Sequence, residues 1–256
     1  GIDLIGNVLL SSTSVSGITL TGSSASGTGM MVTGTTTTVG NVNLNGISST
    51  GDGFGMYDGA SLVATSGDLA VQGSSAAADY FYAGVYMYGN NSIVNNGIGD
   101  VSLIGTASNL GTGVFLYANT FNLNNSSSGT ISLTGNNTNV INNTNSYYGI
   151  GLGDGYNTAV INTTGDVTLN GSVGNGWGAG IFFSNASLTS DGATTVMGSG
   201  GGDVARGVQF EFGNIFTSNS GDLVISGTSA GDAGMQFRDE SIFNQNGGTL
   251  SLNGTA

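Results

Sequence analysis

The stretch Ile18-Thr19-Leu20-Thr21-Gly22 decides the fold, because the chain repeats its form of apolar residue, any residue, apolar residue, any residue, glycine. Further copies end at Gly46, Gly73, Gly105, Gly135, Gly171, Gly227 and Gly254, and a weaker copy ends at Gly198. Strict alternation of apolar side chains with a period of two predicts a β-strand with one buried face.

A second motif, glycine–apolar–any–apolar, alternates with the first. Its copies begin at Gly29, Gly53, Gly84, Gly113, Gly149, Gly180, Gly207 and Gly234. A third, weaker apolar element follows from the second copy onward, as at Leu62-Val63 and Ile93-Val94. A fixed order of strands repeating every ~24–36 residues predicts stacked coils that cover one another's apolar faces. The predicted fold is therefore all-β: a right-handed parallel β-helix (a β-solenoid) of about eight to nine three-stranded coils, with residues 1–256 as one segment.

The composition narrows the range of partners. Charged residues make up 7% of the chain, the formal net charge is -13, and Arg206 and Arg238 are its only Lys or Arg residues. Nucleic acid is excluded as an expected partner because phosphate binding needs clustered cations, and an anionic membrane surface is disfavoured for the same reason. No stretch approaches the ~18 apolar residues of a membrane-spanning helix, so membrane insertion is not expected.

Backbone chemistry agrees with the solenoid. The chain contains no proline, whose missing N–H would interrupt the ladder between coils. Its 48 glycines are expected to supply left-handed conformations at the corners. Because the sequence begins and ends on strand motifs, we expect both ends to be cuts through a longer repeat array.

Stacking turns the outward positions of the second-motif strand into columns. Glu211 and Arg238 are neighbours in one column, which predicts an exposed ion pair. Aromatic side chains gather in the same columns and in the adjoining loops. The candidate ligand-binding residues are Tyr57, Tyr86, Tyr88, Phe115, Tyr117, Tyr80, Tyr82, Tyr147, Tyr148 and Trp177. Such a patch fits a sugar face or a protein partner. Alternatively, the loops fold back and the rings cover one another.

A column of Asp68, Asp100, Asp166 and Asp222 precedes the first-motif strands. We interpret these residues as turn carboxylates that accept backbone N–H groups, with weak calcium binding as the alternative. No metal site, cofactor or catalytic residue is predicted. The chain has no His or Lys, and the carboxylate pairs Asp68/Asp100 and Glu211/Glu240 lie in no recognisable motif. The protein is therefore not expected to be an enzyme.

The strands at Gly99 to Gly105 and Gly165 to Gly171, with their Asn-, Thr- and Gly-rich turns, resemble the repeats of large Gram-negative surface exoproteins. These include filamentous-haemagglutinin-like adhesins of two-partner secretion and autotransporter passenger domains. The resemblance is one of repeat style, and it implies export and folding outside the cell. We therefore expect a non-enzymatic adhesin shaft at the bacterial cell surface, contacting a glycan or protein of a host or neighbouring cell. The alternative is a fibre or sheath subunit that self-assembles through its coil ends or lateral faces.

Overall fold

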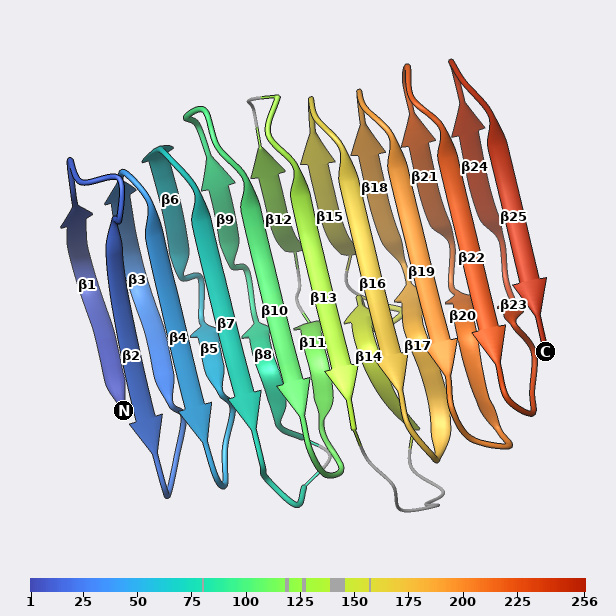
Figure 1. The fold of residues 1–256 in the computed structure, drawn as a ribbon, viewed down its shortest axis with the longest axis horizontal. Coiled ribbons are helices and arrows are strands. Elements are labelled where there is room, and N and C mark those ends of the chain that lie inside the picture. Colours follow the sequence, from blue (N-terminus) through green and yellow to red (C-terminus); the bar gives the residue numbers. More distant parts are fainter. Residues whose placement is uncertain (80, 118–119, 126–127, 139–145, 157) are drawn as a thin grey trace.

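The computed structural model describes residues 1–79, 81–117, 120–125, 128–138, 146–156 and 158–256. The described chain consists of parallel β-strands that wind into a solenoid, with the N-terminal coil at one end and the C-terminal coil at the other (Figure 1). It contains no helix, and hence none that is long and apolar enough to cross a membrane.

The first-motif strands form a sheet of nine on one side of the solenoid. They are β2 (Ile18–Ser24), β4 (Val42–Ser48), β7 (Leu69–Ser75), β10 (Val101–Ala107), β13 (Ile131–Asn137), β16 (Val167–Val173), β19 (Thr194–Gly200), β22 (Leu223–Ser229) and β25 (Leu250–Thr255). They pair in register, so that Gly105 lies between Gly73 and Gly135.

The opposite side is a sheet of sixteen strands that contains the second and third strands of every coil. The second strands are β5 (Phe54–Tyr57), β8 (Ala83–Tyr88), β11 (Thr112–Tyr117), β14 (Ser146–Leu152), β17 (Trp177–Ser184), β20 (Ala205–Glu211) and β23 (Met235–Phe237). The third strands are β6 (Ser61–Ser66), β9 (Ser92–Asn95), β12 (Thr120–Asn125), β15 (Thr158–Thr163), β18 (Ala186–Ser190), β21 (Asn214–Ser218) and β24 (Ser241–Gln245).

Two long strands, β1 (Ile2–Ser11) and β3 (Met30–Val39), show how these two sets are related. Each spans both positions as one strand, with a positive-φ glycine at the junction (Gly6, 74°; Gly34, 115°), and β3 pairs with β5 and then with β6. In several later coils the second and third strands are separate, and a residue with positive φ lies between them, such as Gly89 (95°) or Asn185 (58°). The predicted right-handed parallel β-helix with three strands per coil is confirmed.

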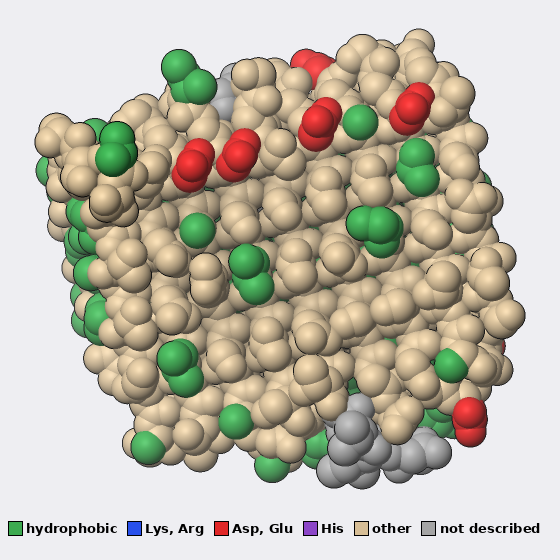
Figure 2. Space-filling model, viewed as in Figure 1, with side chains coloured by type: hydrophobic (Ala, Val, Ile, Leu, Met, Phe, Trp, Pro, Cys, Tyr) green, Lys and Arg blue, Asp and Glu red, His purple; other side chains and the backbone are tan. Residues whose placement is uncertain are grey.

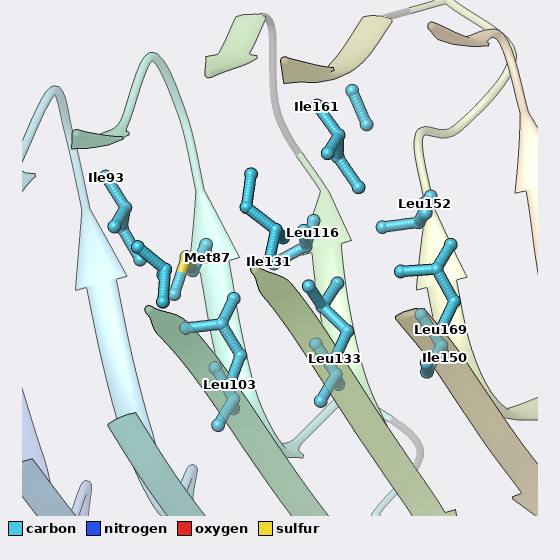
Figure 3. Packing of buried hydrophobic residues seen from close by; sticks show 14 of the residues in the cluster. Met87, Ile93, Leu103, Leu116, Ile131, Leu133, Ile150, Leu152, Ile161 and Leu169 are labelled. Atoms are coloured by element: carbon cyan, nitrogen blue, oxygen red, sulfur yellow. The ribbon is translucent and has the colours of Figure 1, made fainter. Parts of the chain in front are cut away.

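The core is a set of stacked columns between the two sheets (Figure 3). Leu103, Leu133 and Leu169 occupy equivalent positions on successive coils and are fully buried, so each covers the apolar face of the next. Val114, on β11, is 0% exposed and faces this column from the opposite sheet. Burial of one such side chain contributes roughly 1.5–3 kcal/mol.

The motif glycines have another role than the one expected. None of them has a positive φ, and the left-handed conformations predicted for glycine are found at other glycines instead, such as Gly40 (81°), Gly67 (76°) and Gly89 (95°). Instead, a Cβ added at a first-motif glycine meets the backbone of the second-motif glycine across the core, as for Gly105 against Gly113 and Gly135 against Gly149. The two sheets approach so closely here that only a residue without a side chain fits.

The aspartate column lies at the edge where the first-motif strands begin, and acidic side chains follow one another along this edge in Figure 2. Asp68 Oδ1 accepts the backbone N–H of Asp100 at 3.0 Å, and Asp100 Oδ1 accepts that of Thr130 at 2.7 Å. Asp222 accepts the N–H of Thr249 at 2.8 Å, and this bond lowers the pKa of the Asp222 carboxyl. The interpretation as turn carboxylates is confirmed.

Candidate functional site

The predicted aromatic columns form a continuous surface of touching rings. Tyr86 and Phe115 pair on adjacent coils, as do Tyr88 and Tyr117, and their ring centroids are 6.0 and 5.7 Å apart. The planes of Tyr88 and Tyr117 differ by 12°. Tyr57 joins the series at one end, with its ring 6.0 Å from that of Tyr86. Aromatic pairs at these separations attract one another beyond the area that they bury.

Glycines in the same columns give the rings room. Gly55 precedes Tyr86 in its column and Gly151 follows Phe115. A Cβ at Gly55 would lie 2.5 Å from the Tyr57 hydroxyl, and one at Gly151 would lie 2.7 Å from Phe115 Cδ2. Each ring therefore leans over a neighbouring position that has no side chain.

Strand β14 bends at its second-motif glycine, Gly149. The bend changes which residues before the glycine face the core and which face the solvent. A Cβ at Gly149 would point at the first-motif sheet, yet the next residue, Ile150, also lies in the core. Two consecutive inward positions shift the alternation by one. Consequently Tyr148 is on the outside, within 3.3 Å of the position of a Cβ on Gly151, whereas Tyr147 points inward.

The rings enclose a hollow of about 450 Å³ on the outer surface. It is lined by Phe81, Tyr86, Tyr88, Thr112, Phe115, Tyr117 and Tyr148. Thr112 and Tyr148 each directly precede a second-motif glycine, so the hollow forms where the short threonine is followed by a large ring on the next coil. Its volume is within the range of about 300–1,000 Å³ that is typical of small-ligand sites.

Phe182 supports the wall of the hollow from the next coil. Its ring stacks on Tyr148 with centroids 4.5 Å apart and planes 9° apart. Phe182 stands in the same outward column as Phe115, with Gly151 between them. Neither Phe182 nor Thr112 was among the predicted site residues, although the column positions were readable from the sequence.

A buried carboxylate lies at the margin of the aromatic surface. Asp52 is 3% exposed, and its Oδ2 accepts the Tyr57 hydroxyl at 2.5 Å while its Oδ1 accepts the backbone N–H of Ala83 at 2.7 Å. Burial raises the pKa of Asp52 to about 6, against the lowering effect of both hydrogen bonds. This residue was not predicted, because nothing in the local sequence distinguishes it from an exposed turn aspartate.

The hydroxyls of Tyr57, Tyr86 and Tyr117 have raised pKa values and remain protonated at neutral pH. Burial, together with the Asp52 carboxylate, raises the pKa of Tyr57 and of Tyr86. Burial raises the pKa of Tyr117 too, assisted by the carboxylate of Asp154. A neutral phenol both donates and accepts hydrogen bonds, so the hollow combines apolar ring surface with hydroxyl groups.

The structure divides the ten predicted residues. Tyr86, Tyr88, Phe115, Tyr117 and Tyr148 line the hollow, and Tyr57 lies at its margin. Tyr147 was wrongly placed among the surface candidates: it is 1% exposed and packs with Val173 and Ala205, because of the bend at Gly149. Tyr82 is half-buried and Trp177 is 47% exposed, and neither lines the hollow. Tyr80 lies outside the described residues.

The two arginines lie together on neighbouring coils, beyond the aromatic surface. Arg238 Nη1 lies 2.9 Å from Glu211 Oε1, which confirms the predicted ion pair. Arg206 Nε lies 3.1 Å from Asp232 Oδ2, and its Nη1 donates to Gln209 Oε1 at 3.2 Å. In the part of the chain that the structure describes, no three potential metal-binding side chains (His, Cys, Asp or Glu) are grouped to hold an ion.

Comparison of the chain with protein-family models, curated proteins and solved structures gave no match. The site must therefore be interpreted from its own geometry.

Proposed function

We propose that this chain is a non-enzymatic segment of a bacterial surface exoprotein that contacts a ligand on a host or neighbouring cell through its aromatic surface. The observation that carries the proposal is the hollow of about 450 Å³ bordered by contacting rings. Exposed aromatic surface of this kind is typical of interaction sites.

The position of the hollow in the fold supports this proposal. Most of its residues come from β8, β11 and β14, and each of these strands is paired on both sides. Side chains on a fully paired sheet are held more precisely than side chains on loops. A binding surface in the middle of a solenoid also suits an elongated protein that holds its binding site at a distance from the cell.

The non-enzymatic part of the proposal rests on how the carboxylates are used. Asp68 and Asp100, which lie on adjacent coils, accept backbone N–H groups of the turns. Glu211 accepts hydrogen bonds from Arg238 at 2.9 Å and from Gln209 Nε2 at 2.6 Å. These carboxylates hold the coils together, and neither pair faces the aromatic hollow.

The test is binding of the labelled protein to a panel of cells, compared with a Tyr86/Tyr88/Tyr117→Ala variant. Tyr156→Ala is a matched control, because Tyr156 is 93% exposed and does not line the hollow. We expect saturable binding that the triple variant loses and the control retains. Equal binding by all three proteins would refute the proposed role of the aromatic surface.

A further inference from the structure

We infer that the ligand of the aromatic hollow is a neutral carbohydrate chain. This inference rests on the proposed function and adds the ligand class to it. Four of the seven lining residues are tyrosines and a fifth is Thr112, so five hydroxyl groups accompany the apolar ring surface. A sugar has the matching character, with apolar C–H patches and hydroxyls that both donate and accept hydrogen bonds.

The charges of the protein disfavour acidic ligands. No Lys, Arg or His lines the hollow, and Lys and His are absent from the sequence. Arg206 and Arg238 are each paired with a carboxylate, at 3.1 and 2.9 Å. The carboxylate of Asp52 raises the pKa of Tyr86 and that of Asp154 raises the pKa of Tyr117, so both charges that act on these rings are negative. Sulfated or carboxylated sugars and phosphates would meet like charge here.

The pairing of the strands disfavours an extended peptide. Peptides commonly bind a sheet by adding a strand to a free edge. The walls of the hollow stand on β8, β11 and β14, whose backbone edges are all occupied by neighbouring strands. Recognition must therefore use side chains alone, through rings and hydroxyls.

The experiment uses labelled neutral oligosaccharides of glucose, mannose and galactose, six units long, in equilibrium titrations with the whole chain. Choline and an oligogalacturonate of the same length are the cationic and anionic comparisons. Four variants separate ring from hydroxyl: Tyr88→Ala removes a ring, Tyr88→Phe and Tyr117→Phe remove hydroxyls, and Thr112→Met places a longer side chain in the hollow while every ring remains. Tyr156→Ala is the control, and far-UV circular dichroism checks that each variant is folded.

We expect at least one neutral oligosaccharide to bind. Its affinity should fall tenfold or more in Tyr88→Ala and Thr112→Met, roughly three- to tenfold in each Tyr→Phe variant, and not at all in Tyr156→Ala. Binding of choline or oligogalacturonate alone would overturn the neutral-sugar inference and leave the aromatic site standing. Ring-dependent binding to cells without binding of any neutral oligosaccharide would also overturn only the ligand class. Cell binding that is unchanged by Tyr88→Ala would overturn the proposed function as well.

Discussion

Replacing Gly105 by alanine tests the idea that the motif glycines set the distance between the two sheets. The added methyl group would lie 2.5 Å from the carbonyl carbon of Gly113 and 2.8 Å from Val114 Cγ2, and closer still to the Gly113 oxygen. Ordinary contact begins near 3.4 Å. The strands must therefore part by at least about 0.9 Å at this point.

Neither strand can move alone. β10 is hydrogen bonded to β7 and β13, and β11 to β8 and β14. Overpacking a core costs about 1–3 kcal/mol when side chains can yield. Because the obstacle here is mainly backbone, we expect a loss of about 3 kcal/mol or more for Gly105→Ala, expressed as unfolding of the central coils at lower urea concentration.

The assay is urea unfolding followed by far-UV circular dichroism, with Gly27→Ala as the matched control. The nearest atom to a Cβ at Gly27 is Ser24 Oγ at 3.8 Å, and the φ of Gly27 is not positive. We expect this control to be neutral or slightly stabilising, because alanine restricts the unfolded chain. Equal urea midpoints for Gly105→Ala and Gly27→Ala would refute the spacing role of the motif glycines.

Three further predictions concern the core, the buried carboxylate and the ion pair. Val114→Asp should lower the melting temperature sharply, because it buries a charge, whereas Phe115→Asp should not; comparable melting temperatures would contradict the assignment of inward and outward faces. The pKa of Asp52 is raised to about 6 in the folded state, so folding binds protons between pH 4 and 6 and stability falls as the pH rises through that range, by up to about 3 kcal/mol. Asp52→Asn should lack this fall. If the urea midpoints of Asp52→Asn and of the unsubstituted protein changed with pH in parallel, the prediction would be wrong. Arg238→Ala should cost less than about 1 kcal/mol, because the arginine side chain is 52% exposed; a larger loss in urea unfolding would show that the pair is structural.

The repeat architecture could be predicted because its determinants are local and are repeated. The alternation of apolar residues indicates the buried face of each first-motif strand. The recurring glycine indicates the register between neighbouring strands, as the pairing of Gly105 with Gly73 and Gly135 shows. Once the register is known, the residues of each outward column are found by counting positions from the motif glycine of every strand. The contacts of Tyr86 with Phe115 and of Tyr88 with Tyr117 were therefore predictable without any knowledge of loops.

The remaining features of the site depend on geometry that no single repeat encodes. Strict alternation counted back from Ile150 would turn Tyr148 inward and Tyr147 outward, and the bend at Gly149 reverses both. The buried state of Asp52 arises from Tyr57 and from Ala83 on the next coil, at a separation of 31 residues for the latter. The contribution of Phe81 depends on how a loop folds over the sheet, for which the sequence has no periodic signal.

These two kinds of determinant are linked through glycine. At the inner face, Gly105 and Gly113 bring the sheets together because neither has a side chain. At the outer face, Gly55 and Gly151 leave room over which the rings of Tyr57 and Phe115 lean. A residue that contributes no contacts of its own therefore determines both the thickness of the solenoid and the shape of the aromatic surface. Sequence changes at the outer glycines should alter ligand binding while the coils stay intact, whereas changes at the inner glycines should unfold the coils first.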